Sequence, residues 1–327
     1  MRIGVIGPTG PDRFADNITD ALRRGSHDVI QLGPARPSAH NKVVVRASTL
    51  VRQALPRFDA LAQSQIARKA LESDCEIVIN VDSRLMPDAV IRLKRAGVRV
   101  AFWFPDAVIF LGRQFMILAP YDAVFFKEPH IVDRLRANLD LPVHYLPQGC
   151  NPRWHRPLVP PGSEPHIVIA GNMYPSRVRL LERLIAEGIP LKLYGPGFPR
   201  WIGSSPAIAA HTGRYLARED KARSFRAAAA VLNTMHPAEV SGVNVRLFEA
   251  AASGAAVLTE YRPTVPDLFK PNEEVLAFHD FDELLEQARR LLSQQGLTAR
   301  LGNAAAARAH ADHSYDRRVV ELLEKVC

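Results

Sequence analysis

The sequence predicts an α/β protein built from two doubly wound parallel sheets, each forming its own domain. Short apolar runs that read as strands alternate with runs that read as helices along the chain. Runs such as 77–81 are almost continuously apolar, which is typical of strands covered by helices on both faces. At 327 residues the chain is long enough for two domains of ordinary size, each with its own core.

The first domain is predicted to span residues 1–150. Its strands are expected at 2–7, 28–32, 75–81, 98–104, 121–126 and 143–147, with helices such as 87–96 and 129–138 between them. Dense prolines in 151–163 end any regular element, so residues 151–165 are predicted to be a linker.

The second domain is predicted to span residues 166–327. Its strands are expected at 166–170, 191–194, 229–233, 255–259 and 275–278, with helices at 177–187, 218–227, 245–252 and 282–292. The last stretch, 297–325, is predicted to be helical throughout.

Composition excludes several classes of protein. With 47% hydrophobic and 23% charged residues, the chain reads as soluble and globular, and no apolar run approaches the ~20 residues of a membrane span. Met1 runs directly into a strand, so we expect a cytoplasmic protein without an integral membrane segment. Three widely spaced cysteines indicate no zinc site. The net charge of +8 suits anionic partners, but no nucleic-acid motif is present, so we expect no nucleic-acid partner.

The segment 243–260 places one carboxylate, Glu249, in a helix-to-strand run that is otherwise small and apolar. A charge in such surroundings costs several kcal/mol unless it is paired or hydrogen-bonded. Two interpretations follow: Glu249 forms an ion pair with Arg246 one turn earlier, or it reaches the hydroxyls of a ligand.

The residues just before Glu249 read as a strand, a loop and a capped helix. Residues 228–234 are apolar and strand-like, and Asn244 is a suitable N-cap for the next helix. Backbone N–H groups at such a helix start, with Arg246 beside them, would hold a diphosphate, and Glu249 would accept bonds from ribose hydroxyls.

A second loop, 171–177, follows a strand and opens a helix. Arg177 would clamp a phosphate there, and Gly171 would let the backbone approach the ligand closely. The alternative is an ordinary loop with a solvated arginine.

Two further patterns match the residue types of known binding motifs but lack other features of those sites. The glycines at 4, 7 and 10, at the first strand, resemble the glycine pattern of a dinucleotide-binding motif only loosely. The second strand ends without the acidic residue that would bind a ribose. Gly7 and Gly10 are therefore expected in a glycine loop facing the interdomain cleft. Asp280 and Asp282 directly precede a helix, where capping explains them better than a metal does, so no metal ligands are predicted.

Short segments between residues 100 and 325 follow one another in a characteristic order. They are 103–106, 121–126, 145–149, 169–172 with Arg177, 193–195, 232–233, 244–249, 266–269 and 313–315 with Arg317 and Arg318. This series resembles the CgeB-like glycosyltransferases, whose C-terminal half is a family-1-type glycosyltransferase domain with the GT-B fold. The resemblance implies two Rossmann-like domains facing a cleft, with the final helix, 315–326, packing back on the first domain.

The resemblance also implies a donor and the residues that contact it. The donor would be a nucleotide-diphosphate sugar, UDP-, GDP- or TDP-linked, bound without a required metal or other cofactor. The residues expected at the donor site are Gly7, Gly10, Gly171, Asn172, Arg177, Tyr194, Gly195, Asn233, Val243, Asn244, Arg246 and Glu249. The chain departs from many retaining relatives at Ser241, eight positions before Glu249, where they carry a glutamate; Glu239 is the nearest substitute.

An enzyme that inverts configuration also needs a base on the acceptor side, which we expect in the first domain. Asp106, which ends a strand within one of the resembling segments, and His130, at a helix start, are the candidates. A cap or loop carboxylate and a surface histidine are the alternatives, and an enzyme that retains configuration needs no such base.

The sequence thus predicts a glycosyltransferase that moves a sugar from its donor to a saccharide, protein or small-metabolite acceptor. A noncatalytic nucleotide-sugar-binding or assembly protein is the alternative, because the chain lacks the glutamate at 241. A Rossmann oxidoreductase would need nicotinamide at the glycine loop and is less favoured.

Overall fold

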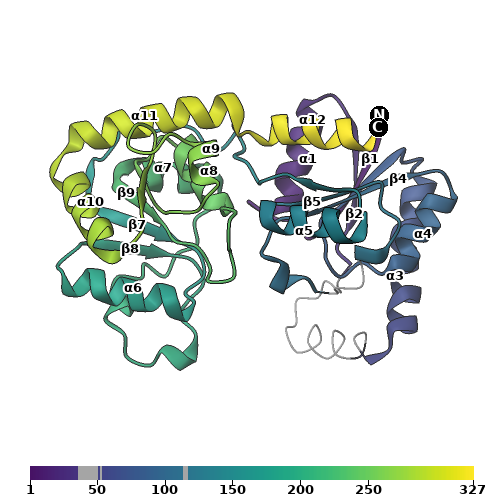
Figure 1. The fold of residues 1–327 in the computed structure, drawn as a ribbon, viewed down its shortest axis with the longest axis horizontal. Coiled ribbons are helices and arrows are strands. Elements are labelled where there is room, and N and C mark those ends of the chain that lie inside the picture. The colour runs from purple at the N-terminus through teal and green to yellow at the C-terminus, as the bar shows by residue number, and fades with distance from the viewer. Residues whose placement is uncertain (36–50, 52–53, 113–116) are drawn as a thin grey trace. The chain divides into compact units, whose positions relative to one another are not determined.

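The computed structural model describes residues 1–35, 51, 54–112 and 117–327. The chain divides into two compact units (Figure 1). Unit 1 comprises Met1–Pro147 and Asp316–Cys327, and unit 2 comprises Gln148–Tyr315. Residues 151–165, expected as a linker, belong to unit 2. Among the described residues, no helix has the length and apolar character needed to cross a bilayer.

Unit 1 contains a six-stranded parallel sheet in the order β2-β1-β3-β4-β5-β6. The strands are β1 (Arg2–Ile6), β2 (Asp28–Gly33), β3 (Ile77–Asn80), β4 (Arg99–Phe104), β5 (Ala123–Phe126) and β6 (Val143–Tyr145). The helices that lie wholly within the described residues are α1 (Phe14–Arg24), α3 (Pro56–Glu72), α4 (Pro87–Arg95), α5 (Pro129–Leu139) and α12 (Tyr315–Val326), with a 3₁₀ turn η1 (Val108–Phe110). Every residue of β3 and β5 is buried, as predicted for strands covered on both faces.

Unit 2 contains a five-stranded parallel sheet in the order β11-β10-β9-β7-β8. The strands are β7 (Glu164–Ala170), β8 (Leu191–Tyr194), β9 (Ala228–Asn233), β10 (Val257–Glu260) and β11 (Leu276–Phe278). The helices are α6 (Pro175–Ala186), α7 (Arg218–Ala227), α8 (Val245–Ala252), α9 (Val265–Leu268), α10 (Phe281–Ser293) and α11 (Gln295–Asp312), with 3₁₀ turns η3 (Arg200–Ile202) and η4 (Pro206–Ile208).

Two apolar layers cover the two faces of the unit 2 sheet. One layer packs α6 and α10 against the sheet through residues such as Leu181 and Leu284. The other packs α7, α8 and α11 through residues such as Phe225, Phe248 and Ala305. Figure 1 shows α6 below this sheet and α7, α8 and α11 above it. The helices that follow β7 and β9 therefore lie on opposite faces, which makes the carboxyl edge between these strands a topological switch point.

The prediction that 297–325 is one continuous helix is wrong. α11 ends at Asp312, and α12 begins at Tyr315. Between them the chain forms a β-bridge with Cys150: the Cys150 N–H donates to the His313 carbonyl, and the Tyr315 N–H donates to the Cys150 carbonyl, both at 2.8 Å. These backbone bonds replace helical ones, so the helix stops there.

α12 is held in unit 1 by its two ends. Arg24 of α1 forms an ion pair with Asp316, and an Arg99 guanidinium N–H donates to the Cys327 carbonyl at 2.8 Å. Since Arg99 begins β4, the C-terminal end of α12 lies at the amino edge of this sheet.

The close approach of α11 to the end of α8 depends on a glycine and gives a testable prediction. A Cβ at Gly302 would lie 2.1 Å from the Gly254 carbonyl oxygen, so Gly302→Ala must push backbone apart and should cost about 1–3 kcal/mol. Gly296, on the same helix, has open space around it, so Gly296→Ala should be neutral or stabilising by up to about 1 kcal/mol. Urea unfolding of the two variants measures the difference, and equal stability would contradict it.

Candidate functional site

The candidate site lies at the switch point of unit 2, where the loops after β7 and β9 meet. Gly171, directly after β7, donates its N–H to the Tyr194 carbonyl at 2.9 Å. A Cβ at Gly195 would lie 2.4 Å from the Gly171 carbonyl oxygen, and both glycines have positive φ, at +138° and +140°. The loops after β7 and β8 therefore touch through their backbones, which only glycine permits here.

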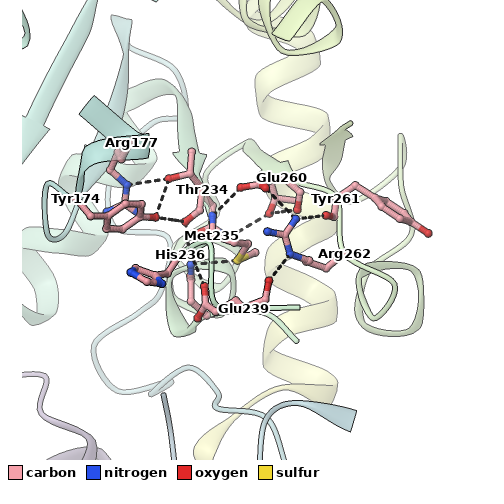
Figure 2. Close-up of polar contacts among 12 residues, drawn as sticks. Tyr174, Arg177, Thr234, Met235, His236, Glu239, Glu260, Tyr261 and Arg262 are labelled. Atoms are coloured by element: carbon pink, nitrogen blue, oxygen red, sulfur yellow. Dashed lines mark hydrogen bonds and ion pairs between the residues drawn. The ribbon is translucent and has the colours of Figure 1, made fainter. Parts of the chain in front are cut away.

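Arg177, in the first turn of α6, joins the loops after β7 and β9. Its Nε donates to the Thr234 hydroxyl at 2.8 Å, its Nη2 to the Thr234 carbonyl at 2.9 Å and its Nη1 to the Asn172 carbonyl at 2.6 Å. Its guanidinium carbon lies 4.3 Å from the centre of the Tyr174 ring. Figure 2 shows the two side chains next to each other. Burial lowers the pKa of Arg177, and the nearby charge of Arg246 acts in the same direction.

The loop 234–244 is held on its other side by the end of β10 and the residues after it. The Met235 N–H donates to a Glu260 carboxylate oxygen at 2.9 Å, and the Arg262 Nε donates to the Glu239 carbonyl at 3.0 Å. Figure 2 shows Glu260 and Arg262 on the opposite side of this loop from Arg177. Its backbone is therefore fixed by protein side chains.

A pocket of about 350 Å³ adjoins Arg177. It lies between the first turn of α6 and the carboxyl ends of β9, β10 and β11. Its walls include Ser176, Arg183, Glu260 and Asp280, so groups of both charges line it. Asp280 caps α10 by accepting from the Glu283 N–H at 2.9 Å, which confirms the prediction of a cap.

Asn244 caps α8, as predicted. Its side-chain oxygen accepts from the Arg246 N–H at 3.0 Å, and its side-chain amide donates to the Thr234 carbonyl at 3.2 Å. The cap therefore ties the helix start to the loop after β9. Val243, directly before it, is fully buried and belongs to the core.

Glu249 is buried on α8, and each of its carboxylate oxygens pairs with a cationic side chain. Lys221 of α7 donates to Oε1 at 2.8 Å, and Arg246 pairs with Oε2. The His155 Nε2 lies 3.8 Å from Oε1. Burial alone would raise the pKa of Glu249, but the charges of Lys221 and Arg246 outweigh it and lower the pKa to about 2. The ion pair with Arg246, one of the two sequence interpretations, is therefore present.

Arg177 and Arg246 converge on Gly171. A Cβ at Gly171 would lie 3.2 Å from the Arg177 Nη1 and 3.9 Å from the Arg246 Nη2. Two guanidinium groups so close to one backbone position repel each other, and an anion placed between them would relieve that repulsion. The geometry therefore suits an anionic ligand.

Asn233, the last residue of β9, lies at the same edge. Its side-chain amide donates to the Thr259 hydroxyl at 3.1 Å. Its side-chain oxygen is buried, and within the described part of the chain it has no hydrogen-bond partner.

The other predicted site residues lie in unit 1. Gly7 is closely packed, since a Cβ there would lie 2.5 Å from a Val81 methyl carbon, and Gly10 has a φ of +138°. Asp106 follows β4 and His130 opens α5 after β5, and both side chains are exposed. Because β4 and β5 are neighbours in the sheet, these two residues follow adjacent strand ends.

Sequence reasoning missed Lys221, Thr234 and His155. One signal for Lys221 was available: it shares a buried helix face with Ala222 and Phe225, a position where an unpaired lysine is costly. No pattern in the sequence indicated which carboxylate it meets.

Known proteins resemble this chain in both sequence and structure. A family model described as glycosyl transferase-like matches residues 177–324. No curated protein matches the sequence. Sucrose-phosphate synthase from Thermosynechococcus elongatus is similar in structure, with a TM-score of 0.71 and 14% identity over 99% of this chain and 97% of that one.

Two other solved structures are similar over nearly the whole chain. Anabaena HepE in complex with UDP-glucose has a TM-score of 0.69 and 13% identity, covering 99% of each chain. A glycosyltransferase from Rickettsia africae has a TM-score of 0.66 and 12% identity, covering 99% of this chain and 97% of that one. With its two parallel-sheet α/β units, the protein therefore has the GT-B fold.

Removing the Glu249 charge should reduce stability in a pH-dependent way. Glu249→Gln leaves Lys221 and Arg246 without their shared anion, so the free energy of unfolding should fall by about 3–5 kcal/mol near neutral pH. The folded pKa of about 2 lies below the ordinary 4.5, so the wild-type advantage is complete above about 4.5 and disappears as the pH falls towards 2. Urea unfolding across this range measures it.

Glu187→Gln is the matched control for Glu249→Gln. Glu187 pairs with Arg289 at 2.9 Å on the exposed surface of unit 2, so its loss should cost less than about 1 kcal/mol. A difference between wild type and Glu249→Gln that stays constant with pH would contradict the prediction.

Proposed function

We propose that the protein is a glycosyltransferase that moves a sugar from a nucleotide-diphosphate sugar to an acceptor without requiring a metal. The observation that carries the proposal is the convergence of Arg177 and Arg246 on Gly171 at the switch point of unit 2. The similarity to Anabaena HepE in complex with UDP-glucose supports it. The ordered segments from residue 103 to Arg318 favour the CgeB-like subgroup.

The diphosphate of the donor fits the two arginines. Both present N–H donors beside a glycine, so the phosphate oxygens can approach the backbone closely. As the bond between sugar and diphosphate breaks, negative charge grows on the leaving phosphate, and fixed guanidinium groups stabilise it. The same cations do the work that a metal would otherwise do, so we propose metal-independent transfer from a UDP-, GDP- or TDP-linked sugar.

The acceptor is proposed to bind unit 1. Asp106 is exposed beyond β4, where it could take the proton of an acceptor hydroxyl if the reaction inverts configuration. His130, beyond the adjacent strand β5, is the second candidate. If configuration is retained, neither acts as a base.

One observation favours a noncatalytic nucleotide-sugar-binding protein as the second candidate. Ser241 stands where many relatives have a glutamate, and its carbonyl accepts from the Thr264 hydroxyl at 2.6 Å. Such a protein would bind the donor through the same arginines but would not transfer the sugar.

A ligand screen tests the proposal. The purified protein is heated with UDP, GDP, TDP, ADP or NAD(H), with and without EDTA, and hits are titrated by calorimetry. We expect one nucleoside diphosphate to stabilise the protein, because a ligand that binds only the folded state raises Tm, and EDTA should not change the effect. Stabilisation by NAD(H) alone, or by none of the ligands, would overturn the proposal.

The two arginines should contribute mainly through the diphosphate. Arg177→Ala or Arg246→Ala should weaken nucleoside diphosphate binding between about tenfold and a hundredfold, because each removes a charged hydrogen-bond donor. Binding of the nucleoside alone should change much less. Arg179→Ala is the control, since Arg179 lies on the same helix with 79% of its side chain exposed. Equal affinity of Arg246→Ala and wild type would refute the assignment.

Asp106→Asn separates binding from turnover. If Asp106 is the base, its loss should leave nucleotide affinity unchanged and lower kcat by about 10²–10⁴-fold. Asp133→Asn, on α5 of the same unit, should leave both unchanged. Unchanged turnover in Asp106→Asn would exclude it as the base, and binding without turnover in wild type would favour the noncatalytic candidate.

A further inference from the structure

The two cations on Glu249 differ in how deeply they are buried. Lys221 has a side chain that is 3% exposed, and its ammonium group donates to Oε1 at 2.8 Å. Arg246 has a side chain that is 20% exposed, and it pairs with Oε2. Lys221 therefore lies inside the core, and Arg246 lies at the edge of the site.

Arg246 also faces a second direction. Its Nη2 lies 3.9 Å from the position of a Cβ at Gly171, beside the Arg177 guanidinium. Its Nε is buried and lacks a hydrogen-bond partner among the described residues. A guanidinium with donors to spare at an anion site is well placed to change partners.

Such a change is possible only if Glu249 keeps a cation. A buried carboxylate without a partner is strongly unfavourable, so Arg246 alone on Glu249 could not leave it. With Lys221 on Oε1, the carboxylate stays paired when Oε2 becomes available. An available carboxylate oxygen in this position can accept a hydrogen bond from a hydroxyl group.

We propose that Lys221 is a positioning residue that anchors Glu249 while Arg246 turns from Glu249 to the donor's diphosphate, which leaves Oε2 for a ribose hydroxyl. The inference rests on the proposed function and adds a coupling to it. Diphosphate binding draws Arg246 away, and its departure prepares the ribose contact. A nucleoside diphosphate is thus recognised as one unit.

Lys221→Met tests the anchor. In this variant Arg246 is the remaining strong partner of Glu249, so its departure leaves a buried charge, and UDP affinity (or that of the screen's best diphosphate) should fall about tenfold or more near pH 7.5. With Lys221 replaced and Arg246 on the diphosphate, burial raises the pKa of Glu249 above the value of about 2 that the two cations maintain, so a proton can remove that charge. The deficit relative to wild type should therefore shrink several-fold as the pH falls to about 5.5.

The ratio of variant to wild-type affinity is the quantity to plot. It cancels the titration of the nucleotide's own phosphates. The basic groups facing Glu249 from the packed elements of unit 2 are Lys221, Arg246 and His155. Lys221→Arg restores a cation at Oε1 and leaves His155 and Arg246 in place, so a pH dependence seen in Lys221→Met and absent from Lys221→Arg reports on the loss of that cation. A purely structural defect would give a ratio that does not change with pH.

Two further variants control for folding. Lys221→Arg keeps the charge and should bind within a few-fold of wild type. Arg226→Met removes another buried cation of α7, one that donates to Gly254 and Asn303, and it should lower stability without changing nucleotide affinity.

The outcomes are distinguishable. A wild-type protein that binds no nucleotide overturns the proposed function and the inference with it. A wild-type protein that binds, with Lys221→Met binding equally well or with a deficit independent of pH, overturns only the inference. A deficit that shrinks at low pH, together with normal binding by Lys221→Arg, supports it.

Discussion

The buried carboxylate of Glu249 is the constraint on which the rest of the site depends. A charge on the inner face of α8 is compatible with folding only if cations reach it, and they come from two helices: Lys221 from α7 and Arg246 from α8 itself. Because Lys221 is 28 positions away in sequence, this pairing fixes α7 against α8. It also brings Arg246 next to the Gly171 loop, so the same bonds that complete the core also build the candidate anion site.

The loops at the carboxyl edge of the unit 2 sheet are held by contacts that do not involve a ligand. The loops after β7 and β8 touch through the backbones of Gly171 and Gly195, and Arg177 joins the loops after β7 and β9 through Asn172 and Thr234. A site organised before the ligand arrives spends less binding free energy on ordering its loops. The repulsion between Arg177 and Arg246 is the cost of that organisation, and a diphosphate would offset it.

A feature could be predicted from the sequence when the interaction that forms it joins residues that are close together in the chain. The helices at 218–227 and 245–252 and the caps at Asn244 and Asp280 follow from neighbouring residues, and the structure has them as predicted. The break between α11 and α12 comes from Cys150, more than 160 positions away, so the helical pattern of 297–325 could not reveal it. The bonds of Lys221 with Glu249 and of Arg177 with Thr234 were not predicted for the same reason, because only the fold brings the two residues of each pair together.

The way the loop 234–244 is held shows how residue 241 can be a serine while the loop backbone keeps its position. Neighbouring side chains bind the backbone of this loop: Glu260 takes the Met235 N–H, Arg262 reaches the Glu239 carbonyl, and Thr264 reaches the Ser241 carbonyl. These three bonds go to backbone atoms of the loop, so they do not depend on which side chains the loop carries. A substitution at 241 therefore leaves these backbone bonds in place, whereas one at 239 also removes the bond from the His236 N–H to the Glu239 carboxylate, so residue 241 can vary with less effect on the loop than residue 239.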